Sequence, residues 1–127
     1  MSKKKKILLI ENDDENRELM RTSLQQDGYE VVIASDGVRG FDKALFVRPD
    51  LIVTGVRIPG ADGMHVLRKV RSTAILEKTP VLITTAFGTG DGTFSLQLGA
   101  NAFEPKPLNS ENFLSTVRRL LNKKKAA

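Results

Sequence analysis

The chain has 127 residues, of which 40% are hydrophobic and 28% charged, and its formal net charge is +5. This composition is typical of one globular domain with a single core. No apolar run approaches the roughly 18 residues of a membrane span, and no hydrophobic signal segment follows the N-terminus. The sequence holds no cysteine, which excludes disulfides and thiolate chemistry. We therefore expect a cytoplasmic protein with no membrane partner.

The positive charge is concentrated at the two ends of the chain, where residues 3–6 and 123–125 are all lysine. Such runs can attract nucleic acid or an acidic surface. No aromatic residues are interleaved with these lysines to stack on bases, and no DNA-reading motif is present. We interpret residues 1–5 and 122–127 as solvated basic tails on a domain of residues 6–121, with no specific nucleic-acid partner.

In the first half of the chain, apolar runs alternate with amphipathic segments. Strands are expected at Ile7 to Ile10 and Tyr29 to Ala34, because both runs are bounded by polar or glycine-containing turns. A helix capped by Asp13 or Asp14 should lie between them and end at Gly28. A second helix should follow the Asp36-Gly37 turn. The apolar positions of these helices are Leu19, Met20, Leu24, Phe41, Ala44, Leu45 and Val47.

The second half continues the alternation. A buried strand begins at Leu51, and a helix over residues 63–71 follows a turn rich in glycine and proline. Pro80 to Thr85 predicts the fourth strand. Gly88, Gly90 and Gly92 predict a flexible connector in Phe87 to Thr93 and a short fourth helix, since glycine disfavours helix. A brief edge strand over Asn101 to Glu104, interrupted by Pro105, precedes a last helix from about Asn109.

Five strands alternating with five helices indicate a parallel sheet with helices on both faces, a doubly wound α/β fold. The ligand crevice of such a sheet lies at the carboxyl ends of its strands. Gly55 ends the third strand, so the position nearest to that crevice has no side chain.

The stretch from Pro49 to Gly63 resembles the third strand and following loop of the receiver domains of two-component response regulators. The family pattern is Pro-Asp-Leu-Ile-x-x-Asp-x-x-Met-Pro-x-x-Asp-Gly, and its internal Asp accepts a phosphoryl group from a histidine kinase. Aligned from either end, that position is Gly55. The resemblance covers Lys6 to Leu121 and implies the flavodoxin-like strand order 2-1-3-4-5.

The same resemblance assigns the remaining positions of the pocket. The acidic pair after the first strand, whose second member binds Mg²⁺, is Glu11-Asn12 here, and Arg17 supports that alignment. The residue whose main-chain carbonyl binds the metal is Arg57. The switch threonine is Thr85, the switch aromatic is Phe103, and the Lys-Pro pair is Lys106-Pro107, for which we expect a cis peptide bond.

Two of these positions have lost the chemistry that the family uses. An aspartyl nucleophile must be a carboxylate, and glycine at 55 supplies none. The amide of Asn12 is a weak ligand for Mg²⁺, which takes carboxylate oxygens in such sites. We expect no phosphoryl transfer, no metal and no other cofactor, with Glu11 and Lys106 satisfying each other and Arg57 left in solvent. The chain is predicted to be a pseudo-receiver, a protein-interaction module and not an enzyme.

Asp50, Thr54 and Asp62 are the nearest candidates for a substitute acceptor. Asp50 belongs at the opposite end of its strand, Thr54 should face away from the crevice, and Asp62 is expected to cap the third helix.

The resemblance also implies a partner surface, because the fourth helix, fifth strand and fifth helix of the family form the face that meets partners. In this chain that face covers Asp91 to Leu121, and the candidate partner is a histidine kinase or an output domain.

Two other interpretations stay open at this stage. The first is a working receiver that is phosphorylated by an unusual route. The second is a flavodoxin-like protein that binds a nucleotide or flavin, although residues 11–15, Glu-Asn-Asp-Asp-Glu, would repel a phosphate. The glycines at 88–92 lack the Lys-Ser/Thr of a P-loop.

Overall fold

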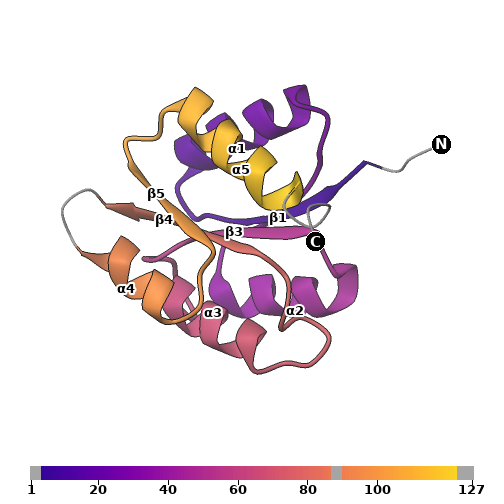
Figure 1. Ribbon diagram of the computed structural model, residues 1–127, viewed down its shortest axis with the longest axis vertical. Helices are drawn as coiled ribbons and strands as arrows, with labels where there is room; N and C mark the ends of the chain where they lie inside the picture. Colours follow the sequence, from indigo (N-terminus) through magenta and orange to yellow (C-terminus); the bar gives the residue numbers. More distant parts are fainter. Residues whose placement is uncertain (1–3, 87–89, 123–127) are drawn as a thin grey trace.

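The computed structural model describes residues 4–86 and 90–122, and within them five parallel strands form one sheet in the order β2-β1-β3-β4-β5. Helices α1 and α5 cover one face of this sheet, and α2, α3 and α4 cover the other (Figure 1). The predicted doubly wound fold and strand order are therefore confirmed. The strands are β1 (Lys6–Ile10), β2 (Glu30–Ala34), β3 (Leu51–Gly55), β4 (Val81–Ala86) and β5 (Ala102–Lys106); the helices are α1 (Asp14–Gln26), α2 (Gly37–Val47), α3 (Gly63–Arg71), α4 (Asp91–Gln97) and α5 (Ser110–Asn122).

Three helices begin at an aspartate whose carboxylate accepts a hydrogen bond from the backbone N–H three residues later. These caps are Asp13, Asp36 and Asp62, with donor–acceptor distances of 2.8, 2.8 and 2.9 Å. The sequence left Asp13 and Asp14 open as caps of α1, and the structure selects Asp13. Each cap satisfies one of the backbone donors that a helix N-terminus leaves unpaired.

The hydrophobic core consists of two layers, one on each face of the sheet. On one face, Leu8, Ile52 and Ile83 pack against α2 and α3. On the other, Leu9, Val53 and Leu82 pack against α1 and α5. Because side chains alternate along a strand, both faces of the central strands are apolar, which is why these strands read as continuous hydrophobic runs.

Helices α1 and α5 are also joined by an ion pair. Arg118 donates two hydrogen bonds to the carboxylate of Asp27, at 2.8 and 2.7 Å. These bonds hold the pKa of Asp27 below its ordinary value, because they favour the charged carboxylate.

Three predictions about local structure are wrong. Leu19, expected on the apolar stripe of α1, is 45% exposed, and the buried residues of this helix are Met20 and Leu24. The fifth strand is not interrupted at Pro105 but continues to Lys106. At the edge of a sheet a strand pairs on one side only, so a proline can be accommodated without breaking the ladder.

The third wrong prediction concerns the glycine-rich segment. Gly92 does not belong to a flexible connector, because it lies inside α4 and is buried. Gly90, at a φ of 80°, immediately precedes that helix, and α4 is short as predicted. Phe87 and Gly88 lie outside the described residues, as do Lys3 and Lys123 to Lys125 of the predicted basic tails.

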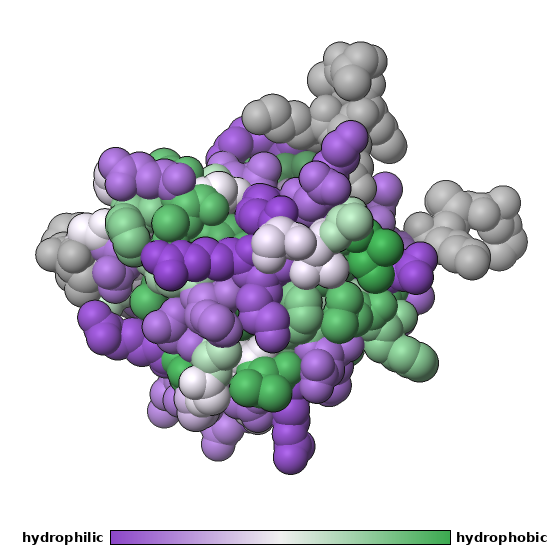
Figure 2. Space-filling view, turned by 90° about the horizontal axis from the view of Figure 1, so that it is seen from below, coloured by the Kyte–Doolittle hydropathy of each residue, from purple (hydrophilic) through white to green (hydrophobic). Residues whose placement is uncertain are grey.

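None of the helices in the described ranges is long and apolar enough to cross a membrane. The face formed by α2, α3 and α4 carries hydrophobic areas among hydrophilic ones (Figure 2). The large hydrophobic side chains that are exposed across the described residues are Leu19, Val38, Phe46, Ile75, Phe94 and Leu96.

Candidate functional site

The carboxyl ends of β1, β3 and β5 bring three of the predicted pocket residues together. Glu11 follows β1, Gly55 ends β3, and Lys106 ends β5. The Glu11 side chain is 2% exposed, and its Oε1 lies 3.2 Å from the Lys106 ammonium nitrogen. The predicted pairing of these two residues is confirmed, and the Lys106-Pro107 bond is cis, as expected.

The Glu11 carboxylate lies close to the position where a side chain at residue 55 would begin. A Cβ atom built on Gly55 would lie 3.2 Å from Glu11 Oε1. The second oxygen of the carboxylate accepts a hydrogen bond from the backbone N–H of Asp13 at 3.0 Å, and Arg17 donates to the Glu11 carbonyl at 3.1 Å. Glu11 is thus fixed on several sides, and its charge is compensated by Lys106.

Thr84 also lies at this site, although it was not predicted. It pairs in register with Gly55, and its Oγ1 lies 3.6 Å from the Gly55 Cβ position. This hydroxyl is buried and has no hydrogen-bond partner among the described residues. The register between β3 and β4 identifies Thr84, and the strand order implied by the family resemblance does not by itself supply that register.

Thr85 and Phe103, the predicted switch pair, line one hollow of about 210 Å³ between α4 and the ends of β4 and β5. The Phe103 ring packs against α4 at Gly92, where an added Cβ would lie 2.3 Å from Phe103 Cδ1. Gly92 was interpreted as a loop residue, so its contact with the ring was missed. The absence of a side chain at 92 is what lets the ring approach the helix this closely.

Asn12 and Arg57 both lie at the surface. Asn12 is exposed, and the Arg57 side chain is 81% exposed, as predicted for Arg57. The Arg57 guanidinium forms an ion pair with Asp91, at the start of α4, with an N–O distance of 3.8 Å. Among the described residues, the enclosed charges of the pocket are therefore Glu11 and Lys106 alone.

Asp50 and Asp62, two of the three candidate substitute acceptors, lie where the sequence predicted them. The Asp50 carboxylate accepts a hydrogen bond from the Lys6 backbone N–H at 2.8 Å, at the opposite end of the sheet. Asp62 caps α3. Thr54 is buried and donates to the Gly55 carbonyl at 3.0 Å. None of the three presents an accessible nucleophile beside Lys106.

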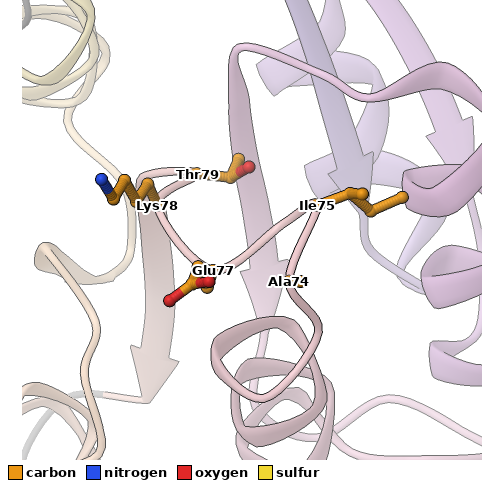
Figure 3. Close-up of a pocket in the computed structure, with 5 residues that line it drawn as sticks. All are labelled: Ala74, Ile75, Glu77, Lys78 and Thr79. Carbon is orange, nitrogen blue, oxygen red and sulfur yellow. The ribbon is translucent and has the colours of Figure 1, made fainter.

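A larger hollow of about 590 Å³ lies elsewhere, in the loop between α3 and β4. Its labelled side chains, among them Ile75, Glu77 and Lys78, point in different directions and do not converge on a common point (Figure 3). A specific ligand site needs converging polar groups. This loop therefore offers no competing site, despite its size.

The comparisons with known proteins agree with the fold described above. Residues 7–118 match the family described as response regulator receiver domain. The chain belongs to this family. Response regulator MprA of Mycobacterium avium is 37% identical over 121 residues, which are 94% of this chain and 52% of that protein, and MprA of Mycobacterium leprae is 36% identical over the same share. The receiver thus spans about half the length of these relatives.

Solved structures of receiver domains superpose closely on this chain. A putative response regulator from Chloroflexus aurantiacus has a TM-score of 0.91 at 28% identity, with 94% of this chain and 98% of that chain covered. The chemotaxis response regulator CheY4 of Vibrio cholerae has a TM-score of 0.86 at 30% identity, covering 94% of this receiver and all of CheY4. The receiver domain PA1611REC of Pseudomonas aeruginosa, at a TM-score of 0.87 and 27% identity, covers 94% of this chain and 99% of its own and holds a magnesium ion in its active site cleft.

The residues of this receiver do not fit such an ion. The one pocket carboxylate, Glu11, is already paired with Lys106, and position 55 offers no side-chain oxygen. In the described parts of the chain, no group of three or more His, Cys, Asp or Glu residues could hold a metal. Mg²⁺ dehydrates reluctantly and is bound through carboxylates, so a neutralised single carboxylate is a poor site.

We expect millimolar Mg²⁺ to leave the melting temperature of the receiver unchanged. A ligand stabilises a fold only when it binds the native state, and here the ion would have to displace Lys106 from Glu11. Thermal unfolding with and without Mg²⁺ measures this. A saturable increase that Mg²⁺ gives and Na⁺ at equal ionic strength does not give would contradict the expectation.

Proposed function

We propose that this receiver is not phosphorylated at the usual position and acts as a protein-interaction module without catalytic activity. The observation that supports this most directly is Gly55 at the acceptor position, next to a buried Glu11 carboxylate that is paired with Lys106. Phosphoryl transfer requires a nucleophile and a cation that neutralises the transferred group. This pocket supplies neither.

The charge of the pocket supports the same proposal. A bound cation stabilises an acidic pocket by offsetting its charge, whereas Glu11 and Lys106 neutralise each other without one. A buried carboxylate left unpaired would be costly. The net charge of the pocket thus stays balanced, because the two negative charges missing at positions 12 and 55 offset the two positive charges of the missing metal. The result is a pocket that stays ordered without ligand.

The proposed partner surface is the region from Asp91 to Leu121, which comprises α4, β5 and α5. Helix α4 exposes Phe94 and Leu96, at 45% and 43%, on an element of only seven residues. Exposed apolar side chains on a short helix suit a contact with another protein. A histidine kinase or the output domain of a regulator is the kind of partner we propose, and the cytoplasm is the proposed compartment.

The two alternatives are less well supported. Membership of the receiver family accounts for the α/β topology without a nucleotide or flavin site. Phosphorylation by an unusual route would need an acceptor, and Asp50, Thr54 and Asp62 are all engaged elsewhere. This second alternative is tested directly below.

Incubation with a small phosphodonor and Mg²⁺ is expected to add no acid-labile phosphate, as measured by intact-mass spectrometry. Gly55→Asp alone should restore little, because its Cβ would lie 3.2 Å from Glu11 Oε1 and Asn12 still supplies only an amide. The double variant Gly55→Asp/Asn12→Asp should accept more phosphate, since it regains both carboxylates. One added phosphoryl group on the chain without substitutions would refute the proposal and favour the interpretation as a working receiver.

A further inference from the structure

A basic hollow lies at the end of the domain opposite to the degenerate pocket. It has a volume of about 300 Å³ and is lined by Lys4, Lys5, Lys6, Val47, Arg48 and Asp50. It forms where the start of β1 meets the end of α2 and the start of β3, joined by the hydrogen bond from Lys6 N–H to the Asp50 carboxylate. Four cationic side chains and one carboxylate thus surround one concave surface.

The four cations of this hollow have no acidic partner among the described residues. The ion pairs of the described chain involve other basic residues, such as Arg17, Arg39 and Arg118. The single carboxylate of the hollow, Asp50, is engaged by a backbone N–H. A concave surface with several unpaired cations raises the local concentration of anions.

Arg48 reaches this surface through an unusual backbone conformation. It is the C-cap of α2 and has a φ of 52°, the one positive φ of a non-glycine residue in the described ranges. Glycine or asparagine is the common residue at such a cap. A non-glycine residue in this conformation is strained, which makes the Arg48 side chain a candidate for a functional role.

An exposed aromatic side chain lies next to these cations in the chain. Phe46 immediately precedes the lining residues Val47 and Arg48 and is 91% exposed, the largest exposure of any large hydrophobic side chain in the described residues. The sequence showed no aromatic residue among the terminal lysines. The fold brings the end of α2 to the start of β1, so Phe46, which is not itself a lining residue, lies one position before the part of α2 that lines the hollow. Cations that follow a phosphate backbone together with an exposed aromatic ring are the components of a surface for single-stranded nucleic acid.

We propose that this surface, Lys4 to Lys6 with Phe46 and Arg48, binds single-stranded nucleic acid without sequence preference, through phosphate contacts and stacking of a base on Phe46. This activity is independent of the degenerate pocket at the other end of the sheet. The presence of an aromatic ring favours nucleic acid over an acidic polypeptide, which offers charge but no bases to stack.

The test is fluorescence anisotropy with a labelled oligothymidylate of about 20 nucleotides and the full chain, over about 50 to 200 mM salt. Binding should weaken as salt rises. Lys5→Gln/Arg48→Gln should lower the slope of log K against log salt by about 1.4, because each phosphate contact to a single strand contributes about 0.7. The matched control Arg68→Gln/Lys78→Gln, which removes two exposed cations elsewhere, should leave the slope of log K against log salt unchanged.

Two further variants separate binding from folding. Phe46→Ala should weaken binding about tenfold with an unchanged salt slope, because stacking is not electrostatic. Arg48→Gly should reduce the slope without lowering the melting temperature, since glycine adopts the positive φ more readily. Any of four results would overturn the proposal. The first two are equal effects of the two double variants and an unchanged affinity of Phe46→Ala. The other two are polyglutamate binding as tight as that of the oligonucleotide and no binding at low salt.

Discussion

Replacing Lys106 by methionine is expected to destabilise the domain by about 2–3 kcal/mol, although methionine keeps the apolar stem of the side chain. The change leaves the Glu11 carboxylate, 2% exposed, without its cation. Removing one partner of a fully buried ion pair costs about 3–5 kcal/mol, and we expect less here because Lys106 is 30% exposed. Urea unfolding followed by circular dichroism measures the difference.

The companion variants make this result specific to the pair. Glu11→Gln should cost less than Lys106→Met, because an unpaired Lys106 can still reach water while the glutamine keeps the hydrogen bond from Asp13 N–H. The double variant Glu11→Gln/Lys106→Met should be more stable than Lys106→Met alone, since it no longer buries an unpaired charge. A loss below about 0.5 kcal/mol for Lys106→Met would show that the ion pair does not hold the pocket together.

Replacing Phe94 and Leu96 by serine is expected to reduce partner capture at least tenfold, by about 1.4 kcal/mol or more. These side chains are the exposed apolar groups of α4, so their removal should leave the core intact. The measurement is a quantitative pull-down with the isolated receiver, in which captured proteins are compared between variants by mass spectrometry. Thermal unfolding of each variant establishes that the fold is retained.

Matched controls lie on the other helices. Leu19 on α1 is 45% exposed, the same fraction as Phe94, and Val38 on α2 is 55% exposed. Leu19→Ser and Val38→Ser remove similar apolar area from faces that the proposal does not use, so capture should be unchanged. Capture that depends on Leu19 or Val38 and not on the α4 residues would place the partner surface on another face.

Much of the fold followed from local patterns in the sequence. The buried runs at Ile7 and Leu51, the aspartate caps and the short α4 are set by hydrophobic periodicity and by the chemistry of neighbouring residues, which act within a few positions. The strand order came from the family resemblance, because no local pattern encodes which strands are neighbours. The glycine at position 55 was also evident from the sequence, since the surrounding motif aligns from both sides.

The pairing of Glu11 with Lys106 could be predicted once the family resemblance had assigned both residues to one pocket, because two opposite charges at the strand ends need each other when they are buried. The position of Thr84 beside Gly55 and the packing of the Phe103 ring on Gly92 were decided only by the tertiary structure. Both depend on the register between strands and on how closely α4 approaches the sheet. The basic hollow has the same origin: Lys4 to Lys6 and Arg48 are far apart in the sequence, and parallel pairing of β1 and β3 is what brings them together.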